Sequence, residues 1–226
     1  MISVEHIYQS LKDLSTKGKG GYTDSVEFNR NSQRAELLLW QYYFSIYEIG
    51  RRVPEAMVPF IKIDTLSLTA AAFSLPDSWG HTLNIQHVST LNGPECGTEP
   101  VTKKVLARYL QKHELHMTLE SPIRGKGTFY SFTEDRRVQM YPETLTGQAS
   151  LEYLRYPTFA LRAYTLDVVN QEQNPDSVNS VDYEWQPQEE NNLIDILLLF
   201  HGLINRDTHL MQWAQTHQSI TQMQVK

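Results

Sequence analysis

The hydrophobic residues near the start of the chain recur every three or four positions. This spacing predicts an amphipathic helix over residues 3–15 with one narrow apolar stripe. The stripe consists of Val4, Ile7, Leu11 and Leu14. Three glycines within Lys17–Gly21 then predict the end of the helix and a turn.

A second, longer helix is expected from Asp24 to Gly50. Glu27 lies three residues after Asp24, which is the spacing of a capping box. The apolar residues expected on one side of this helix are Phe28, Ala35, Leu38, Leu39, Tyr42, Ile46 and Ile49. Further aromatic residues widen the apolar surface, so the helix needs partners on more than one face. We therefore assign Leu38, Tyr42 and Ile46 to a candidate subunit interface.

The pattern changes to short alternating segments after Pro54. Phe60–Ile63 and Leu83–Val88 alternate as half-buried strands do. Val105, Leu106 and Tyr109 fit one side of a helix from Lys103 to about Leu115. Three further strands are expected, antiparallel because short turn sequences separate them: Thr128–Phe132, Arg137–Tyr141 and Ser150–Tyr156.

The C-terminal part returns to a helical pattern. A polar stretch over Gln171–Trp185 predicts an extended surface segment, and Pro187 with two following glutamates suits the start of a helix that loosens at Gly202. A last helix carries Leu210, Met211, Trp213, Ile220 and Met223. These five side chains either pack onto their own domain or form an arm that docks into another subunit.

These elements together predict an α+β fold. We expect a helical bundle, formed by the N- and C-terminal helices, with an inserted small antiparallel β domain. Residues 1–53 would form the N-terminal part of the bundle. Residues 54–186 would form the β-rich domain with one helix and the extended segment, and residues 187–226 the C-terminal helices and the docking arm.

Composition narrows the functional class. The 226 residues carry a formal charge of −6, so no overall basic field draws the chain onto nucleic acid. A single cysteine, Cys96, excludes an intramolecular disulfide framework and fits a reducing cytoplasm. We expect a soluble protein, because no signal peptide is evident and the longest apolar run, Leu193–Ile204, is too short and too interrupted to cross a bilayer.

Candidate catalytic chemistry is sparse. His113 and His116 lie three residues apart and could face the same way on a helix, but they lack the usual metalloprotease spacing and a matched third ligand. The glycine-rich loops Lys17–Gly21 and Arg124–Gly127 are read as turns, with contact to phosphate or an acidic partner as the alternative. Cys96 is read as a bystander thiol. We expect no catalytic, cofactor-binding or metal-binding residue.

The order of short motifs resembles the ring and connector proteins of podovirus-like tailed phages, and most closely the structural proteins of the crAss-like phages of gut Bacteroidales. The motifs that carry the resemblance are Gly20–Thr23, Glu27–Asn29, Arg34–Leu37, Leu75–Asp77, Tyr141–Pro142, Tyr153–Pro157 and Glu184–Trp185. The chain departs from the expected pattern over Leu91–Pro100 and in the single tyrosine between Arg155 and Pro157.

The resemblance implies a virion structural protein, namely an adaptor below the portal. It implies a homo-oligomeric ring of twelve subunits through whose lumen double-stranded DNA passes during genome ejection. The expected partners are other copies of the chain, the portal protein, and the next tail ring or tail-hub proteins, without a membrane. It implies assembly in the cytoplasm of a bacterial host, no enzymatic activity and no cofactor.

Two alternatives remain at this stage. One is a different tail-associated structural subunit, such as a fibre adaptor or a head-decoration protein. The other is a metal-dependent hydrolase that uses His113, His116 and a carboxylate that the sequence does not identify.

Overall fold

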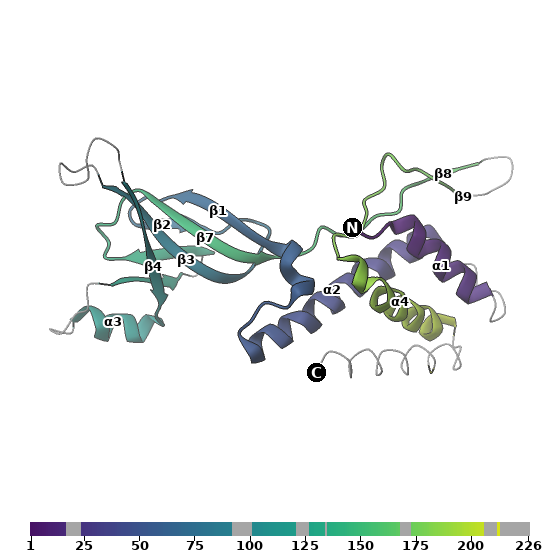
Figure 1. The fold of residues 1–226 in the computed structure, drawn as a ribbon, viewed down its shortest axis with the longest axis horizontal. Helices are drawn as coiled ribbons and strands as arrows, with labels where there is room; N and C mark the ends of the chain where they lie inside the picture. The colour runs from purple at the N-terminus through teal and green to yellow at the C-terminus, as the bar shows by residue number, and fades with distance from the viewer. Residues whose placement is uncertain are drawn as a thin grey trace. The chain divides into compact units, whose positions relative to one another are not determined.

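The computed structural model of the chain describes residues 1–16, 24–91, 101–120, 127–133, 135–167, 173–205 and 212. The chain forms two compact units. We call Met1–Pro59 together with Pro157–Lys226 the helical unit, and Phe60–Tyr156 the sheet unit (Figure 1). The sheet unit is thus inserted into the helical unit in sequence. Within the described residues, no helix combines the length and apolarity that a bilayer span requires.

In the described part of the helical unit there are three α-helices. They are α1 (Val4–Thr16), α2 (Ser25–Gly50) and α4 (Glu190–Asn205), and α4 packs against both of the others. Their apolar stripes meet in a core whose residues include Ile7, Phe28, Leu39, Leu193 and Leu197, all buried. Burial of each such side chain contributes roughly 1.5–3 kcal/mol to folding. This packing fixes α2, which carries the candidate interface.

The start of α2 is stabilised differently from the capping box that the sequence predicts. Asp24 has the extended backbone of a cap, but its side chain makes no capping hydrogen bond. Instead Gln173 accepts a hydrogen bond from the Ser25 N–H (3.2 Å) and donates one to the Asp24 carboxylate (2.5 Å). The cap is therefore supplied by a residue distant in sequence.

Short elements complete the helical unit. These are η1 (Glu55–Phe60), which runs into the sheet unit, the two-stranded ribbon of β8 (Tyr164–Leu166) and β9 (Gln173–Pro175), and η3 (Pro187–Glu189). Ile2 also forms an antiparallel bridge with Tyr183. The N-terminus is thus paired with a segment that follows the insertion in sequence.

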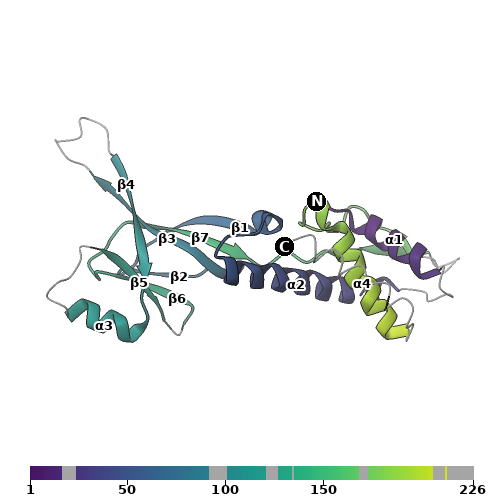
Figure 2. The same cartoon turned by 60° about the horizontal axis from the view of Figure 1, so that its bottom comes forward.

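The sheet unit contains one seven-stranded sheet with the order β1-β7-β3-β4-β5-β6-β2. The strands are β1 (Ile61–Ser67), β2 (Ala72–Ser74), β3 (Trp79–Leu91), β4 (Val101–Tyr109), β5 (Thr128–Phe132), β6 (Arg137–Tyr141) and β7 (Gln148–Arg155). All pairs are antiparallel except β4 and β5, which are parallel. The helix α3 (Lys112–Glu120) connects these two parallel strands. Figure 2 shows the sheet unit from a second direction.

The expected fold class is wrong. The structure is dominated by a large mixed sheet with few helices, and is not a helical bundle that carries a small antiparallel β domain. Two sequence interpretations caused this error. Lys103–Leu115 was expected to be a helix, but Val101–Tyr109 is a strand and the helix begins at Lys112. In addition, β3 is a 13-residue strand, whereas the alternation of apolar and polar residues predicted a strand only over Leu83–Val88.

The strand Ser150–Tyr156 was expected to follow Arg137–Tyr141 in an antiparallel meander. The observed strand β7 instead lies between β1 and β3, distant from β6 in the sheet. The expected β-rich domain spans residues 54–186, whereas the compact sheet unit ends at Tyr156. Residues 157–186, which include the expected extended segment Gln171–Trp185, belong to the helical unit.

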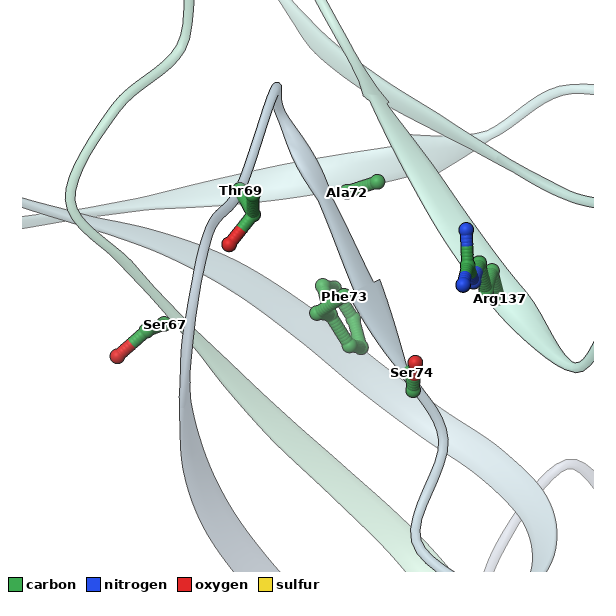
Figure 3. A pocket seen from close by; sticks show the side chains of 6 residues that line it. All are labelled: Ser67, Thr69, Ala72, Phe73, Ser74 and Arg137. Atoms are coloured by element: carbon green, nitrogen blue, oxygen red, sulfur yellow. The ribbon is translucent and has the colours of Figure 1, made fainter.

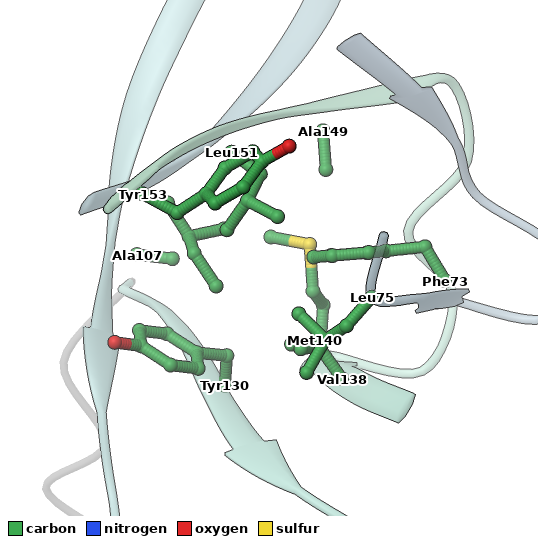
Figure 4. Close-up of a cluster of buried hydrophobic side chains, with 10 residues drawn as sticks. Phe73, Leu75, Ala107, Tyr130, Val138, Met140, Ala149, Leu151 and Tyr153 are labelled. Carbon is green, nitrogen blue, oxygen red and sulfur yellow. The ribbon is translucent and has the colours of Figure 1, made fainter. Parts of the chain in front are cut away.

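The core of the sheet unit lies on one face of this sheet. Its buried residues come from six strands and their flanks: Phe73, Leu75, Ile85, Ala107, Tyr130, Val138, Met140, Ala149, Leu151 and Tyr153 (Figure 4). Alternate residues of β7 enter this core, because successive side chains of a strand point to opposite faces. The inserted unit therefore has a hydrophobic core of its own.

Candidate functional site

An exposed apolar stripe runs along the C-terminal half of α2. Leu38 is 47% exposed and Ile49 is 87% exposed, while Tyr42 and Ile46 are half-buried. The four residues follow one another at spacings of four, four and three, so they lie along one side of the helix. We call Leu38, Tyr42, Ile46 and Ile49 the α2 stripe. An apolar stripe of this kind on a folded subunit is typical of a surface that associates with another protein.

The opposite side of α2 accounts for the rest of its apolar surface. Leu39, Trp40, Tyr43 and Tyr47 are buried, and the hydroxyl of Tyr43 donates a hydrogen bond to Glu189 (2.7 Å). Burial is the main cause that raises the pKa of the Tyr43 hydroxyl, and the hydrogen bond to Glu189 raises it further. The apolar residues of α2 therefore form two groups: one packs within the subunit, and the other lies on its surface.

A buried carboxyl lies next to this helix surface. Glu36 is fully buried, and its Oε1 accepts the backbone N–H of Ala160 at 2.7 Å. Its Oε2 has no hydrogen-bond partner among the described residues. Burial raises the pKa of Glu36 to about 8, and the nearby Glu184 carboxylate adds to the rise, while the Ala160 hydrogen bond opposes it. The group is therefore protonated at neutral pH.

The chain that follows Tyr156 is anchored at a second point by Arg162. Arg162 is 2% exposed, and its Nε lies 2.7 Å from the Glu5 carboxylate. Its guanidinium also lies 3.8 Å from the centre of the Tyr8 ring and donates a hydrogen bond to Ser25. The Asn29 amide pairs with both the N–H and the C=O of Arg162. This cluster joins α1, α2 and the extended segment, and its bonds are all internal, which indicates a structural role.

The structure places the two histidines of the candidate metal site in α3. His113 is exposed, and His116 belongs to the same helix. Among the residues that the structure describes, no group of three or more His, Cys, Asp and Glu side chains is arranged to hold a metal ion. Nothing in the described part of the chain therefore supplies a third ligand.

Several sequence-based candidates lie outside the described residues. These are Cys96, the two glycine-rich loops apart from Gly127, and the five residues of the expected docking arm, Leu210, Met211, Trp213, Ile220 and Met223. The structure therefore places Leu38, Tyr42 and Ile46 of the candidate interface and not the arm. Sequence periodicity included Ile49 among the apolar residues of the helix without assigning it to that interface.

The charge of the chain is divided unequally between its two units. The sheet unit contains ten basic and ten acidic side chains, whereas the helical unit contains ten basic and sixteen acidic ones. The whole net charge of −6 therefore resides in the helical unit. At the start of α2, Asp24, Glu27, Arg30 and Arg34 line an open pocket of about 460 Å³ that contains two acidic and two basic side chains.

No protein-family model matches this chain, and no curated protein matches it either.

Proposed function

We propose that the chain is a virion structural protein, a ring-forming head–tail connector subunit that joins the portal to the tail around the DNA exit channel. The α2 stripe is the observation that carries this proposal. A ring subunit must cover apolar surface against its neighbours, and Leu38 and Ile49 are large apolar residues that the subunit leaves exposed. The ordered motifs of the sequence support the same assignment.

The distribution of charge is compatible with a channel. A polyanion slides past an acidic or neutral wall, whereas a basic wall holds it through phosphate contacts. The helical unit carries an excess of six acidic side chains and the sheet unit carries no excess of either sign. Neither unit as a whole therefore carries the basic excess that would retain DNA.

Negative-stain electron microscopy with rotational analysis of end-on views tests the proposal. The purified full chain is imaged at high concentration, alone and with the cognate portal. Twelve-fold rings on the portal are expected. Monomers in both samples would contradict the connector assignment, and single copies bound at the periphery of the portal or tail would indicate a fibre adaptor or decoration protein.

A further inference from the structure

The strand β1 has an open edge. It is the first strand in the order of the seven-stranded sheet, and among the described strands it pairs only with β7. The Leu68 N–H donates to the Gly147 C=O in the same register. Because hydrogen-bonded pairs alternate in an antiparallel ladder, Leu66, Asp64 and Lys62 also bond to β7. The N–H and C=O groups of Ile63, Thr65 and Ser67 therefore point away from β7.

The three positions of this edge whose backbone groups face outward carry no proline and no charged side chain. Natural edges are protected by proline, by charged side chains or by bulges. Ile63, Thr65 and Ser67 are exposed and uncharged, and Ile63 is 63% exposed. The single cation of the strand, Lys62, lies 3.4 Å from Asp64 of the same strand. The register of β1 with β7 is continuous from Ile61 to Ser67, without a bulge.

A cationic pocket lies at the end of the open edge. It has a volume of about 340 Å³ and is lined by Ser67, Thr69, Ala72, Phe73, Ser74 and Arg137. Figure 3 shows these residues around the turn where β1 and β2 diverge. Arg137 is the only charged residue among them, and three others carry hydroxyl groups. The lining favours an acidic group at the end of an incoming strand.

The ribbon of β8 and β9 has a complementary edge. The Asp176 N–H donates to the Ala163 C=O in the register of the ribbon, so the backbone groups of Tyr164 and Leu166 point away from β9. The outer edge of β9 is blocked because Pro175 has no N–H. Leu166 is 63% exposed, and Asp167 follows it at the end of the strand. A two-stranded ribbon is only marginally stable by itself, which favours a third strand.

We propose that β8 of one copy of the chain pairs with the open edge of β1 in a second copy. The backbone groups of Tyr164 and Leu166 bond to those of Ile63 and Thr65, with β8 parallel to β1. This direction brings Asp167 towards the pocket that contains Arg137, where opposite charges attract. The contact joins two different surfaces, so it repeats from copy to copy and can close a ring. In this respect the inference rests on the proposed connector function.

Disulfide cross-linking between two variants tests the contact. Both variants carry Cys96→Ser, one also carries Thr65→Cys and the other Thr165→Cys, which replaces the residue opposite Thr65 in the proposed register, and a cleavable tag on one gives the two chains different masses. After mild oxidation of the mixture, a mixed dimer is expected at a yield about tenfold above that of the control, because pairing raises the local concentration of the two thiols. The control replaces Thr165→Cys by Val178→Cys, a position that is 88% exposed but outside the ribbon strands. A yield equal to the control overturns the proposal.

A double variant, Thr65→Cys with Thr165→Cys in the Cys96→Ser chain, excludes pairing within one copy. We expect oxidised multimers, and an oxidised monomer that contains the 65–165 disulfide would overturn the proposal.

Thr65→Pro provides a second test that does not depend on cysteine chemistry. The Thr65 N–H points away from β7, so proline removes no bond of the ladder, and the chain should fold normally. It should form rings at least about tenfold less readily than Thr65→Ala, a factor that corresponds to about 1.4 kcal/mol. Equal ring formation by both variants would overturn the edge contact and leave the connector assignment intact. Failure of the unmodified chain to form rings, together with a normal mixed dimer, would overturn the connector assignment alone.

Discussion

The carboxyl of Glu36 in α2 accepts the backbone N–H of Ala160 at 2.7 Å. This bond holds the segment that leaves the sheet unit against the longest helix of the helical unit. Two further groups anchor the same segment, since Asn29 pairs with the backbone of Arg162 and Glu184 accepts the Thr158 N–H at 3.0 Å. These side chains hold the segment in addition to the backbone bridge between Leu161 and Val181.

Glu36 predicts a dependence of stability on pH. The pKa of Glu36 is about 8 in the folded chain, against an ordinary value of 4.5. Between these two pH values the folded state keeps a proton that the unfolded state loses, so the free energy of unfolding falls as the pH rises, by about 1.4 kcal/mol per pH unit from this group. Its stabilising contribution is complete below pH 4.5 and is lost by pH 8.

Urea unfolding across this pH window measures the effect. Glu36→Gln should remove this part of the slope, because the amide keeps an acceptor oxygen and does not titrate. Glu48→Gln is the matched control, since Glu48 lies exposed on the same helix, and it should keep the slope. An unchanged slope in Glu36→Gln would show that other groups dominate the pH dependence.

The α2 stripe predicts opposite effects for two neighbouring leucines. Leu38→Asp should fold and should change the free energy of unfolding by less than about 1 kcal/mol, because Leu38 is half exposed. Leu39→Asp should prevent folding, because it would bury an unpaired carboxylate at a cost of several kcal/mol. Circular dichroism and electron microscopy of the two variants separate the two effects.

Under the connector proposal, Leu38→Asp should abolish rings while Gln41→Asp, at an exposed polar position of the same helix, should keep them. Normal rings from Leu38→Asp would exclude the α2 stripe from the subunit interface. Unfolding of Leu38→Asp would place Leu38 in the core instead.

The Arg162 cluster predicts a large loss of stability from one substitution. Arg162→Met should lower the free energy of unfolding by about 3 kcal/mol, because it removes the partner of Glu5 and several internal hydrogen bonds of a buried site. Glu5→Gln should cost less, since its amide oxygen can still accept from Arg162. Thermal unfolding of the two variants measures the difference, and equal losses would contradict the central role of the arginine.

Two glycines provide a matched comparison of backbone conformation. Gly147 has a φ of +104°, and an added Cβ would lie 3.1 Å from the Val88 carbonyl oxygen. Gly147→Ala should therefore destabilise the chain by roughly 1–3 kcal/mol. Gly50→Ala meets nothing within 4 Å at the end of α2, and should be neutral or stabilising by up to about 1 kcal/mol. Denaturant unfolding compares the two, and similar values would contradict the strain at Gly147.

The two N-terminal helices were predictable from local pattern, whereas α3 and the order of strands in the sheet were not. Periodicity placed the helix that begins after Asp24 and ends at Gly50, because a wide apolar surface is visible within one segment. Val105, Leu106 and Tyr109 fit a helix as well as a strand, and pairing with β3 and β5 decides in favour of the strand. The capping role of Gln173 could not be predicted, since nothing near Ser25 in the sequence indicates a partner so distant.

The candidate site was predictable only in part. Spacing identified Leu38, Tyr42 and Ile46 as apolar positions on one side of the helix, but it could not separate exposed Leu38 from buried Leu39. That distinction depends on where α4 packs. The open edge of β1 could not be derived from sequence, because it requires the order of strands in the sheet.

The bridge between Ile2 and Tyr183 has a consequence for the order of folding during translation. The ribosome releases α1 and α2 first, but Tyr183, Trp185 and α4, which complete their core, emerge only after the whole sheet unit. The sheet unit is continuous in sequence and can fold as soon as it leaves the exit tunnel, in keeping with the general tendency of domains to fold as units during synthesis. The early helices must therefore wait with their apolar faces uncovered, and a nascent-chain chaperone would find its binding site there.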